Sequence, residues 1–303
     1  MKKLLIFVII TIVFLWIVSS NSLESEHQST IDDLFFGTDS TFEVMTWNLQ
    51  NFPKNKETTV DYVTQIIYNL DIDIVGFQEI QCDSSFTLLI EQLNQIDTLN
   101  AWDGYRANSD KWEMNLAFLY KSDVVNIRNI YEIYEDDRYA FPRLPLVMEL
   151  IYNTTRVVII NNHLKAKGGE KNESRRKDAC IKLDKFVEDN FSDVAVIILG
   201  DLNDDINEPE EQNVFWNFIG DSDNYTFADM EIAADSTSDW SYPYWPSHLD
   251  HILITNELFD EFRNEGSTIK TITIDKHLKG GWDTHYQNLS DHRPVAIKLR
   301  FAE

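Results

Sequence analysis

Short apolar runs and helix-like spacings alternate along the chain from residue 42 onward. The segment 42–48, FEVMTWN, predicts a strand, and apolar residues then recur at helical spacing over 60–70. A second strand is predicted at 73–79, DIVGFQE, and a second helix at 86–96. This alternation of strand and helix indicates an α/β protein.

Consecutive β-structure is predicted next, because four apolar runs between 115 and 164 follow one another across short connections: NLAFLY, VVNIRNIY, LPLVMELIY and RVVIINNHL. YNTT, at 152–155, is typical of a hairpin turn. The second half returns to alternation, with helices predicted near 172–190 and 210–219 and strands at 194–200, 250–255, 268–274 and 294–300. Two similar halves predict two facing sheets with helices outside, in one domain at 42–303.

The first 41 residues differ from the rest. Residues 1–20 hold two lysines and an apolar run, Leu4 to Val18, followed by small residues, a pattern typical of a cleaved secretory signal peptide. As a helix this run would span about 22 Å, short of the roughly 30 Å hydrocarbon core, so an uncleaved membrane anchor is the weaker alternative. Residues 21–41 are polar and acidic and are interpreted as a tether. The sequence therefore predicts a secreted or periplasmic, extracytoplasmic protein.

The charge balance is strongly acidic, with 26 Lys and Arg against 51 Asp and Glu, or −25 overall. This balance argues against a broad basic face for nucleic acid, so an anionic substrate would need local help, most simply from a bound divalent cation. Export permits disulfides, but the only two cysteines are Cys82 and Cys180, and their pairing stays open.

Polar side chains interrupt the apolar runs where the predicted strands end or begin. One of them, an amide inside the buried 42–48 run, would cost about 1–3 kcal/mol if it were buried without partners. A single such residue is usually a turn or cap residue, but several of one kind at strand ends indicate a shared cleft. The expected site comprises Asn48, Glu79, His163, Asp201, Asn203, Asp250, Asp291 and His292.

The chemistry of these residues points to phosphate esters. The carboxylates of Glu79, Asp201 and Asp291 are hard oxygen ligands, which select Mg²⁺, Mn²⁺ or Ca²⁺ over zinc. The imidazoles of His163 and His292 can act as general acids or bases. A cation with such ligands and a nearby acid or base is the usual arrangement for phosphate ester hydrolysis.

Six motifs carry a family resemblance: TWNLQNF, GFQEI, NNHLKA, ILGDLND, LDHILI and SDHRPV. In this order, over about residues 42–300, they resemble the strand-end motifs of the endonuclease/exonuclease/phosphatase superfamily. That superfamily includes deoxyribonuclease I, apurinic/apyrimidinic endonucleases, neutral sphingomyelinases and inositol polyphosphate phosphatases. The resemblance implies a DNase I-like four-layer α/β/β/α sandwich of two facing mixed sheets, with the active cleft at one edge.

The resemblance also implies a metal site and a phosphate site. Glu79 would be the principal metal ligand, with Asn48 beside it. Asp201 and Asn203 would orient the attacking water and the phosphate. Asp291 would approach a second metal position or the water.

Two histidines would complete the catalytic set. Asp250 would pair with His292 and fix its tautomer. His163 would be the second catalytic histidine, supported by a residue near Met114, with Glu113 and Asn115 as the alternatives.

The remaining positions concern the substrate. Arg143 resembles a phosphate-contacting arginine of deoxyribonuclease I, and Arg175 would reach the cleft mouth. Gln50 stands where some relatives carry a metal-associated Asp, which argues against a second metal there. A zinc site at His248 and His251 is rejected, because their spacing of three puts them on opposite faces of a strand.

The sequence thus predicts an exported phosphodiesterase that uses Mg²⁺ or Mn²⁺, with Ca²⁺ in a supporting role. The favoured interpretation is a monomeric nuclease without a stable protein partner that hydrolyses DNA or RNA by in-line water attack. Alternatives are a phosphodiesterase or phosphatase of lipid or inositol phosphates, and a non-catalytic binding protein. Tyr242, Tyr244 and Trp245 keep the lipid alternative open, although the simplest interpretation is that they pack a loop.

Overall fold

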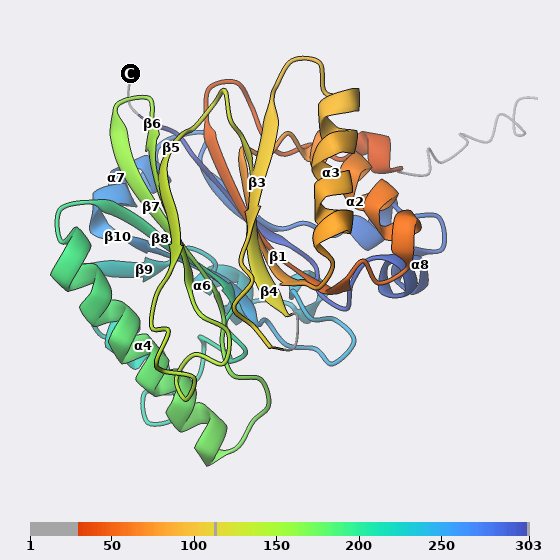
Figure 1. The fold of residues 1–303 in the computed structure, drawn as a ribbon. Coiled ribbons are helices and arrows are strands. Elements are labelled where there is room, and N and C mark those ends of the chain that lie inside the picture. Colours follow the sequence, from red (N-terminus) through yellow and green to blue (C-terminus); the bar gives the residue numbers. More distant parts are fainter. Residues whose placement is uncertain (1–29, 112–113, 302–303) are drawn as a thin grey trace, which may run out of the picture.

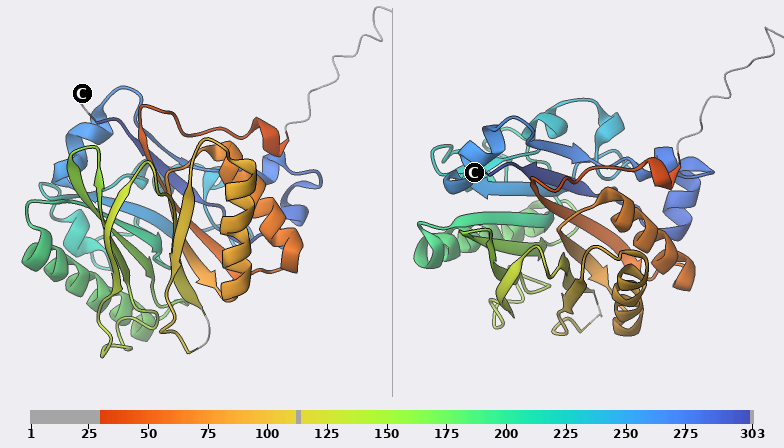
Figure 2. Two further views of the ribbon diagram at one scale, coloured as in Figure 1. Left: turned by 45° about the horizontal axis from the view of Figure 1, so that its top comes forward. Right: turned by 90° about the horizontal axis from the view of Figure 1, so that it is seen from above.

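The computed structural model describes residues 30–111 and 114–301, so the predicted signal peptide lies outside the described residues. Within them, two six-stranded sheets face each other and helices cover their outer sides (Figure 1). Figure 2 shows the same layers from two further directions. The predicted four-layer α/β/β/α sandwich is confirmed.

The first sheet has the order β11-β12-β1-β2-β4-β3, in which β1 and β2 are parallel and the other neighbours antiparallel. Its strands are β1 (Phe42–Phe52), β2 (Ile74–Ile80), β3 (Trp102–Arg106), β4 (Asn115–Lys121), β11 (Thr268–Thr271) and β12 (Val295–Leu299). The sequence did not predict β3. This strand has five residues and only Trp102 is buried, so no alternation of apolar and polar residues can be recognised in it.

The second sheet has the order β5-β6-β7-β8-β10-β9, and here β7 and β8 are the parallel pair. Its strands are β5 (Asn126–Glu132), β6 (Leu146–Tyr152), β7 (Thr155–His163), β8 (Ala195–Asp201), β9 (Tyr225–Phe227) and β10 (Asp250–Thr255). The predicted hairpin is confirmed, because Tyr152 pairs with Thr155 and Asn153 adopts a left-handed φ of 53° between them.

Helices α2 (Lys56–Leu70) and α3 (Asp83–Ile96) lie outside the first sheet, and α4 (Glu170–Phe191) lies outside the second (Figure 1). The helix predicted at 210–219 is reduced to α5 (Trp216–Ile219), which has four residues. No helix of the described residues is long and apolar enough to cross a membrane. The shorter helices are α5 (Trp216–Ile219), α6 (Met230–Ala234), α7 (Phe259–Arg263), α8 (Gly281–Asn288), η1 (Ile31–Asp33), η2 (Thr237–Asp239), η3 (Asn256–Leu258) and η4 (Ile274–His277).

Three apolar layers hold the sandwich together, as alternating strand residues require. On β1, Met45 and Trp47 pack toward α2 and α3, while Phe42 and Val44 pack toward the second sheet. The third layer joins the second sheet to α4 through residues such as Leu183.

The domain begins earlier than residue 42. Leu34 and Phe36, in the segment interpreted as a tether, are buried in the layer between α2, α3 and the first sheet. The Lys298 ammonium donates to the Phe36 carbonyl at 2.9 Å. Leu34 and Phe36 belong to an apolar run of only three residues between acidic and polar neighbours, which is too short to form a periodic pattern, so the predicted boundary is too late.

The two cysteines belong to different layers. Cys82 directly precedes α3, outside the first sheet, whereas Cys180 is buried within α4, outside the second. Both are free thiols in the structure.

A buried carboxyl pair lies at the end of β1 opposite to Asn48. The Glu43 N–H donates to Asp73 Oδ2 at 3.1 Å, and the Lys121 ammonium lies 3.3 Å from Asp73 Oδ1. Burial, together with the charge of Asp73, raises the pKa of Glu43 to about 8. The Glu43 carboxyl is therefore neutral in the folded protein at pH 7.

This shift predicts that the fold loses stability as the pH rises from about 4.5 to about 8. An unfolded Glu ionises near pH 4.5, so stability contributed by the neutral Glu43 carboxyl falls as pH rises toward 8. Glu43→Gln should remove this loss, on the order of a few kcal/mol, and urea midpoints between pH 5 and 9 would measure it. Glu57→Gln, on the exposed side of α2, is the control. Equal pH slopes for wild type and Glu43→Gln would contradict the prediction.

Candidate active site

Strand alternation places four polar side chains at one edge of the layer between the sheets. On β1 the face carrying Phe42 and Val44 ends at Asn48. By the same alternation the inward faces of β7 and β8 end at His163 and Asp201, and that of β10 begins at Asp250. Because β10 is antiparallel to β8, its first residue lies beside the last of β8.

Glu79 reaches this edge by a different route. It follows Gln78, which faces the second sheet, so regular alternation would turn Glu79 away. Instead the pairing of β2 shifts register between Phe77 and Ile80, and Glu79 takes a left-handed φ of 63°. This bulge turns the Glu79 carboxylate toward Asn48. Such backbone costs on the order of 1 kcal/mol and is typical of functional sites.

The Asn48 amide joins two carboxylates. Its Nδ2 donates to Asp201 Oδ2 at 2.9 Å and lies 3.3 Å from Glu79 Oε1. Its Oδ1 accepts the Gln50 N–H at 2.9 Å. The polar residue inside a buried strand is therefore fully partnered by the site.

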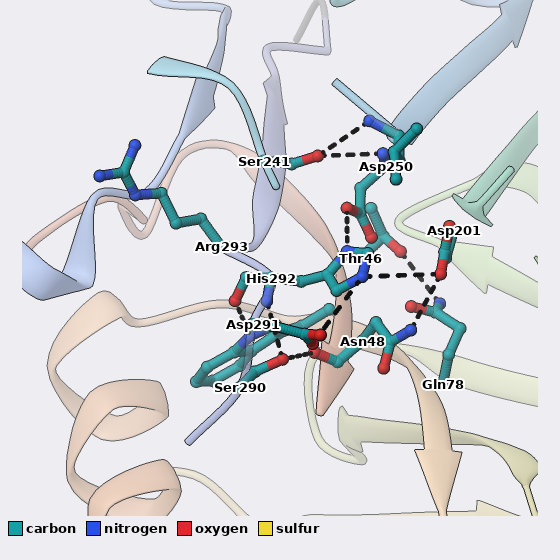
Figure 3. A network of polar contacts seen from close by, with 12 residues as sticks. Thr46, Asn48, Gln78, Asp201, Ser241, Asp250, Ser290, Asp291, His292 and Arg293 are labelled. Carbon is teal, nitrogen blue, oxygen red and sulfur yellow. Dashed lines mark hydrogen bonds and ion pairs between the residues drawn. The ribbon is translucent and has the colours of Figure 1, made fainter. Parts of the chain in front are cut away.

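Asp250 and His292 make the expected contact, with His292 Nδ1 2.7 Å from Asp250 Oδ2 (Figure 3). Two serines fix the backbone around them. Ser241 Oγ accepts the Asp250 N–H at 3.1 Å. Ser290 Oγ accepts the His292 N–H at 3.0 Å and donates to the Asn48 carbonyl at 2.6 Å.

Asp201 lies between the two imidazoles. Its Oδ2 is 3.3 Å from His163 Nε2 and 3.9 Å from His292 Nε2. The same ring nitrogens approach the other two carboxylates: His163 Nε2 is 4.0 Å from Glu79 Oε1, and His292 Nε2 is 4.0 Å from Asp291 Oδ1. The sequence-predicted carboxylates and histidines therefore form one continuous cluster.

The surroundings drive the two histidines to opposite protonation states. Burial, helped by the charge of Arg143, holds the pKa of His163 well below its usual value, so this imidazole is neutral. Burial also disfavours a charged His292, but the carboxylates of Asp250 and Asp201 outweigh it and raise its pKa to about 10. Burial raises the pKa of Asp201 to about 7, against the opposing charge of His292. Such divergence is how one site provides both an acid and a base.

Asp291 is held by a hydrogen bond from Gln50, which is in turn contacted by Lys54, a residue that the sequence analysis did not assign to the site. Gln50 Nε2 donates to Asp291 Oδ2 at 2.7 Å, and the Lys54 ammonium donates to Gln50 Oε1. Gln50 thus places a neutral amide beside the Asp291 carboxylate.

A cleft with a volume of about 600 Å³ opens over this cluster. Arg143 and Asn203 line it, and the Asn203 N–H donates to Asp201 Oδ1 at 3.2 Å. Arg175 is not among the described residues that line it. Its Nε donates to the Tyr139 carbonyl at 2.5 Å, so this placement does not support the predicted substrate contact.

The neighbouring Arg176 does not line the cleft but holds a loop that does. It is buried, forms an ion pair with Asp204 at 2.7 Å, and donates to the carbonyls of Lys165 and Lys167 at 2.6 and 2.9 Å. It therefore holds the loop after β7, where Lys167 lines the cleft.

Comparison with known proteins agrees with this geometry. The sequence profile of the Endonuclease/Exonuclease/phosphatase family matches residues 45–292. The chain belongs to this family. Its members are hydrolytic phosphoesterases and generally depend on divalent metal ions. No curated protein matches the sequence.

Solved structures share the fold of this family member. D. rerio TDP2 complexed with a single-strand DNA product superposes with a TM-score of 0.63 at 14% identity, covering 87% of this chain and 100% of that one. The human nocturnin catalytic domain with bound sulfate gives 0.60 at 16% identity, covering 87% and 95%. An endonuclease/exonuclease/phosphatase from Bacteroides vulgatus gives 0.60 at 14%, covering 86% and 99%.

The donor set of this family member fits a hard divalent cation. Burial raises the pKa of both Glu79 and Asp201, which indicates negative charge that the protein itself does not fully compensate. Asp250 Oδ1 is buried and has no hydrogen-bond partner among the described residues. Glu79, Asn48 and Asp291 would hold the ion through oxygen. The group Asp201, Asp250 and His292 is more compact, but the raised pKa of His292 keeps a proton on the imidazole nitrogen that would otherwise bind the ion.

No described residue supports His163 through its second ring nitrogen. Its Nδ1 is buried without a hydrogen-bond partner among the described residues. Met114 lines the cleft, while Asn115 Oδ1 accepts the Asp110 N–H at 3.1 Å. Glu113, the other candidate, lies outside the described residues.

Sequence reasoning missed a polar brace between the sheets, directly behind the site. Gln78 Nε2 donates to Asn161 Oδ1 at 2.8 Å and to Thr46 Oγ1 at 3.0 Å. Asn161 Nδ2 in turn donates to the Phe77 and Ala117 carbonyls at 3.0 and 3.1 Å. The signal was present in two motifs, because Gln78 directly precedes Glu79 and Asn161 stands two residues before His163.

The prediction that His248 and His251 lie on opposite faces of a strand is wrong. His248 precedes β10, so strand alternation does not apply to it. Both rings contact buried Asp229, at 3.0 Å from His248 Nε2 and 2.6 Å from His251 Nδ1. The other ring nitrogens contact the Ser241 N–H and the Asp204 carbonyl. All four nitrogens are engaged, which makes this a hydrogen-bonded cluster without a free metal ligand.

The contact between His292 and Asp250 predicts non-additive kinetics. His292→Ala should lower kcat on a phosphodiester with an unactivated alkyl leaving group, such as a dinucleotide linkage, by about 10²–10⁴, because it removes an acid or base. Adding Asp250→Ala should cost little more, since the carboxylate acts through the imidazole. His277→Ala, in η4 and outside the cleft, is the control. Multiplicative losses would show that Asp250 works independently.

Proposed function

We propose that this protein is a divalent-metal-dependent phosphodiesterase and that its substrates are nucleic acids, which it cuts by in-line attack of water. The observation that carries the proposal is the Asn48 amide between Glu79 and Asp201, with His163 and His292 on either side of Asp201. A non-catalytic binding protein is disfavoured because every element of this cluster is retained.

The residues of the chain divide the chemistry among them. Arg143 and Asn203 bind phosphate oxygens in the cleft. Asp201, whose pKa of about 7 lies near neutral pH, accepts the proton of the attacking water. His292, charged at neutral pH and oriented by Asp250, stabilises the leaving oxygen. A divalent ion at Glu79, Asn48 and Asp291 would supply the positive charge that polarises the phosphate and the water.

Local cations support a nucleic-acid substrate in spite of the net charge of −25. Arg143 and Lys167 line the cleft, and the charges of Arg143 and Lys165 both act on His163. The structure of D. rerio TDP2 with a DNA product adds support by analogy of fold. All proposed catalytic groups come from one chain, so we propose that the protein acts as a monomer.

A substrate panel tests this proposal. Single- and double-stranded DNA, RNA, sphingomyelin and inositol polyphosphates would be incubated with the protein in Mg²⁺ or Mn²⁺ and in excess chelator. Nucleic acid should be cleaved, and chelator should abolish turnover. Hydrolysis of lipid or inositol phosphate alone would show that the substrates belong to that class and are not nucleic acids. Full turnover in chelator would refute metal dependence.

Glu79→Gln tests whether this carboxylate binds the metal ion. It should lower activity and raise the metal concentration needed for half-maximal rate, since one carboxylate ligand is lost. The fold should persist, because removing a carboxylate from an acidic cluster also relieves repulsion. Thermal melting with and without Mg²⁺ separates the two effects. Unchanged metal dependence would show that Glu79 is not a metal ligand.

We also propose that the chain is exported and that its first ~20 residues are cleaved, on the strength of the apolar run Leu4 to Val18. Intact mass of protein recovered outside the cytoplasm of an exporting host should show a chain that begins after Ser20. Leu15→Asp should block export. A mature chain that still begins at Met1 and fractionates with membranes would replace cleavage with anchoring.

A further inference from the structure

A short hairpin with an aromatic tip stands beside the catalytic cluster. Tyr242 and Ser247 close it through two backbone hydrogen bonds, at 3.0 and 3.2 Å. Its tip carries Tyr244 and Trp245, each next to a proline. We call residues 242–247 the aromatic hairpin. The prolines and the closing bonds limit the backbone freedom of the tip.

The base of the aromatic hairpin is fixed to the interior. Ser241 and His248, on either side of it, are buried, and the Ser241 N–H donates to His248 Nδ1 at 3.2 Å. His248 is in turn held by Asp229, and Ser241 Oγ accepts the N–H of Asp250. The tip is therefore positioned relative to the catalytic carboxylate and is not a free loop.

The two tip rings are open to solvent although they line the cleft. Tyr244 is 65% exposed and Trp245 is 74% exposed, and both line the cavity that also contains Asp201 and His292. The simplest sequence-based interpretation, that these aromatics pack a loop, is wrong for this pair. Exposed rings in a cleft, on a fixed backbone, are typical of a ligand-binding surface.

Aromatic rings continue from the catalytic histidine to the tip. The Tyr242 ring centroid lies 4.8 Å from that of His292. Tyr244 stacks on Tyr286 of α8, with centroids 5.6 Å apart and planes 16° apart, and the Lys54 ammonium lies 4.0 Å from the Tyr286 centroid. Tyr244 is thus already part of a stack that one more planar ring can extend.

Cations occupy a different part of the same cleft. Arg143 and Lys167 line it, and the charge of Arg143 acts on His163, whereas the aromatic hairpin contacts His292. Aromatic rings for bases and basic side chains for phosphates are the combination that binds single-stranded nucleic acid. A lipid surface is the less favoured occupant, because the rings line a concave cleft together with the catalytic residues.

We propose that Tyr244 and Trp245 stack on unpaired nucleobases adjacent to the scissile phosphate, which makes single-stranded nucleic acid the preferred substrate. This inference rests on the proposed function, since it names the substrate of the same site.

Steady-state kinetics on short single-stranded oligonucleotides test the proposal. Tyr244→Ala and Trp245→Ala should each raise KM about 5- to 100-fold, the range expected for loss of one stacked base, while kcat changes less than about threefold. Trp245→Phe should restore most of the affinity and Trp245→Leu should not, because stacking needs a planar ring. Tyr68→Ala, which removes an exposed ring from α2 outside the cleft, is the matched control.

An oligonucleotide of the same length with abasic residues around the cleavage site provides the second arm. Wild type and the two alanine variants should share one elevated KM on it, because no base is present to stack. Equal KM for wild type and variants on normal oligonucleotides would overturn the stacking role while leaving the nuclease proposal intact. Absence of any oligonucleotide cleavage by wild type would instead overturn the proposed function.

Two further results would also overturn the stacking role. One is a Trp245→Leu variant that binds oligonucleotides as well as wild type, which would indicate plain apolar contact. The other is binding of wild type to sphingomyelin and phosphatidylcholine vesicles that Trp245→Ala abolishes, with KM for oligonucleotides unchanged. That result would reassign the aromatic hairpin to a lipid surface.

Discussion

The rest of the site depends on holding two carboxylates close together away from bulk water. Glu79 and Asp201 would repel each other if nothing lay between them. The Asn48 amide contacts both, and the two imidazoles contact Asp201 from either side. This concentration of charge explains why β2 accepts a left-handed residue at Glu79 and why a buried strand ends in an amide. The surrounding serines and the Gln78–Asn161 brace keep the geometry fixed.

Much of this arrangement could be predicted, for a physical reason. Alternation along a strand is a local property, so Asn48, His163, Asp201 and Asp250 can be assigned to one face from their neighbours alone. Parallel and antiparallel pairing then brings them to one edge. Glu79 is different, because alternation predicts the wrong face for it, and its place at a strand end together with its motif indicates the site.

What could not be predicted depends on contacts between distant segments. The bulge at Glu79 and the burial of Leu34 and Phe36 leave no periodic signal. The meeting of His248 and His251 on Asp229 depends on where β10 begins, which a spacing rule applied to sequence alone misjudges by a few residues. Arg175 shows the same limit, because its position on a helix near the cleft does not reveal that its hydrogen bonds point to Tyr139.

The aromatic hairpin separates recognition from catalysis within one protein. Its shape comes from backbone hydrogen bonds and from a buried base, whereas its tip side chains contribute little to the core. Residues at such a tip can be exchanged in evolution with small effects on stability, since surface substitutions away from the core usually change it by about 0.5 kcal/mol or less. A lineage could therefore change what its enzyme recognises while the acid, the base and the metal ligands stay the same, which is one physical route by which a single fold comes to serve many substrates.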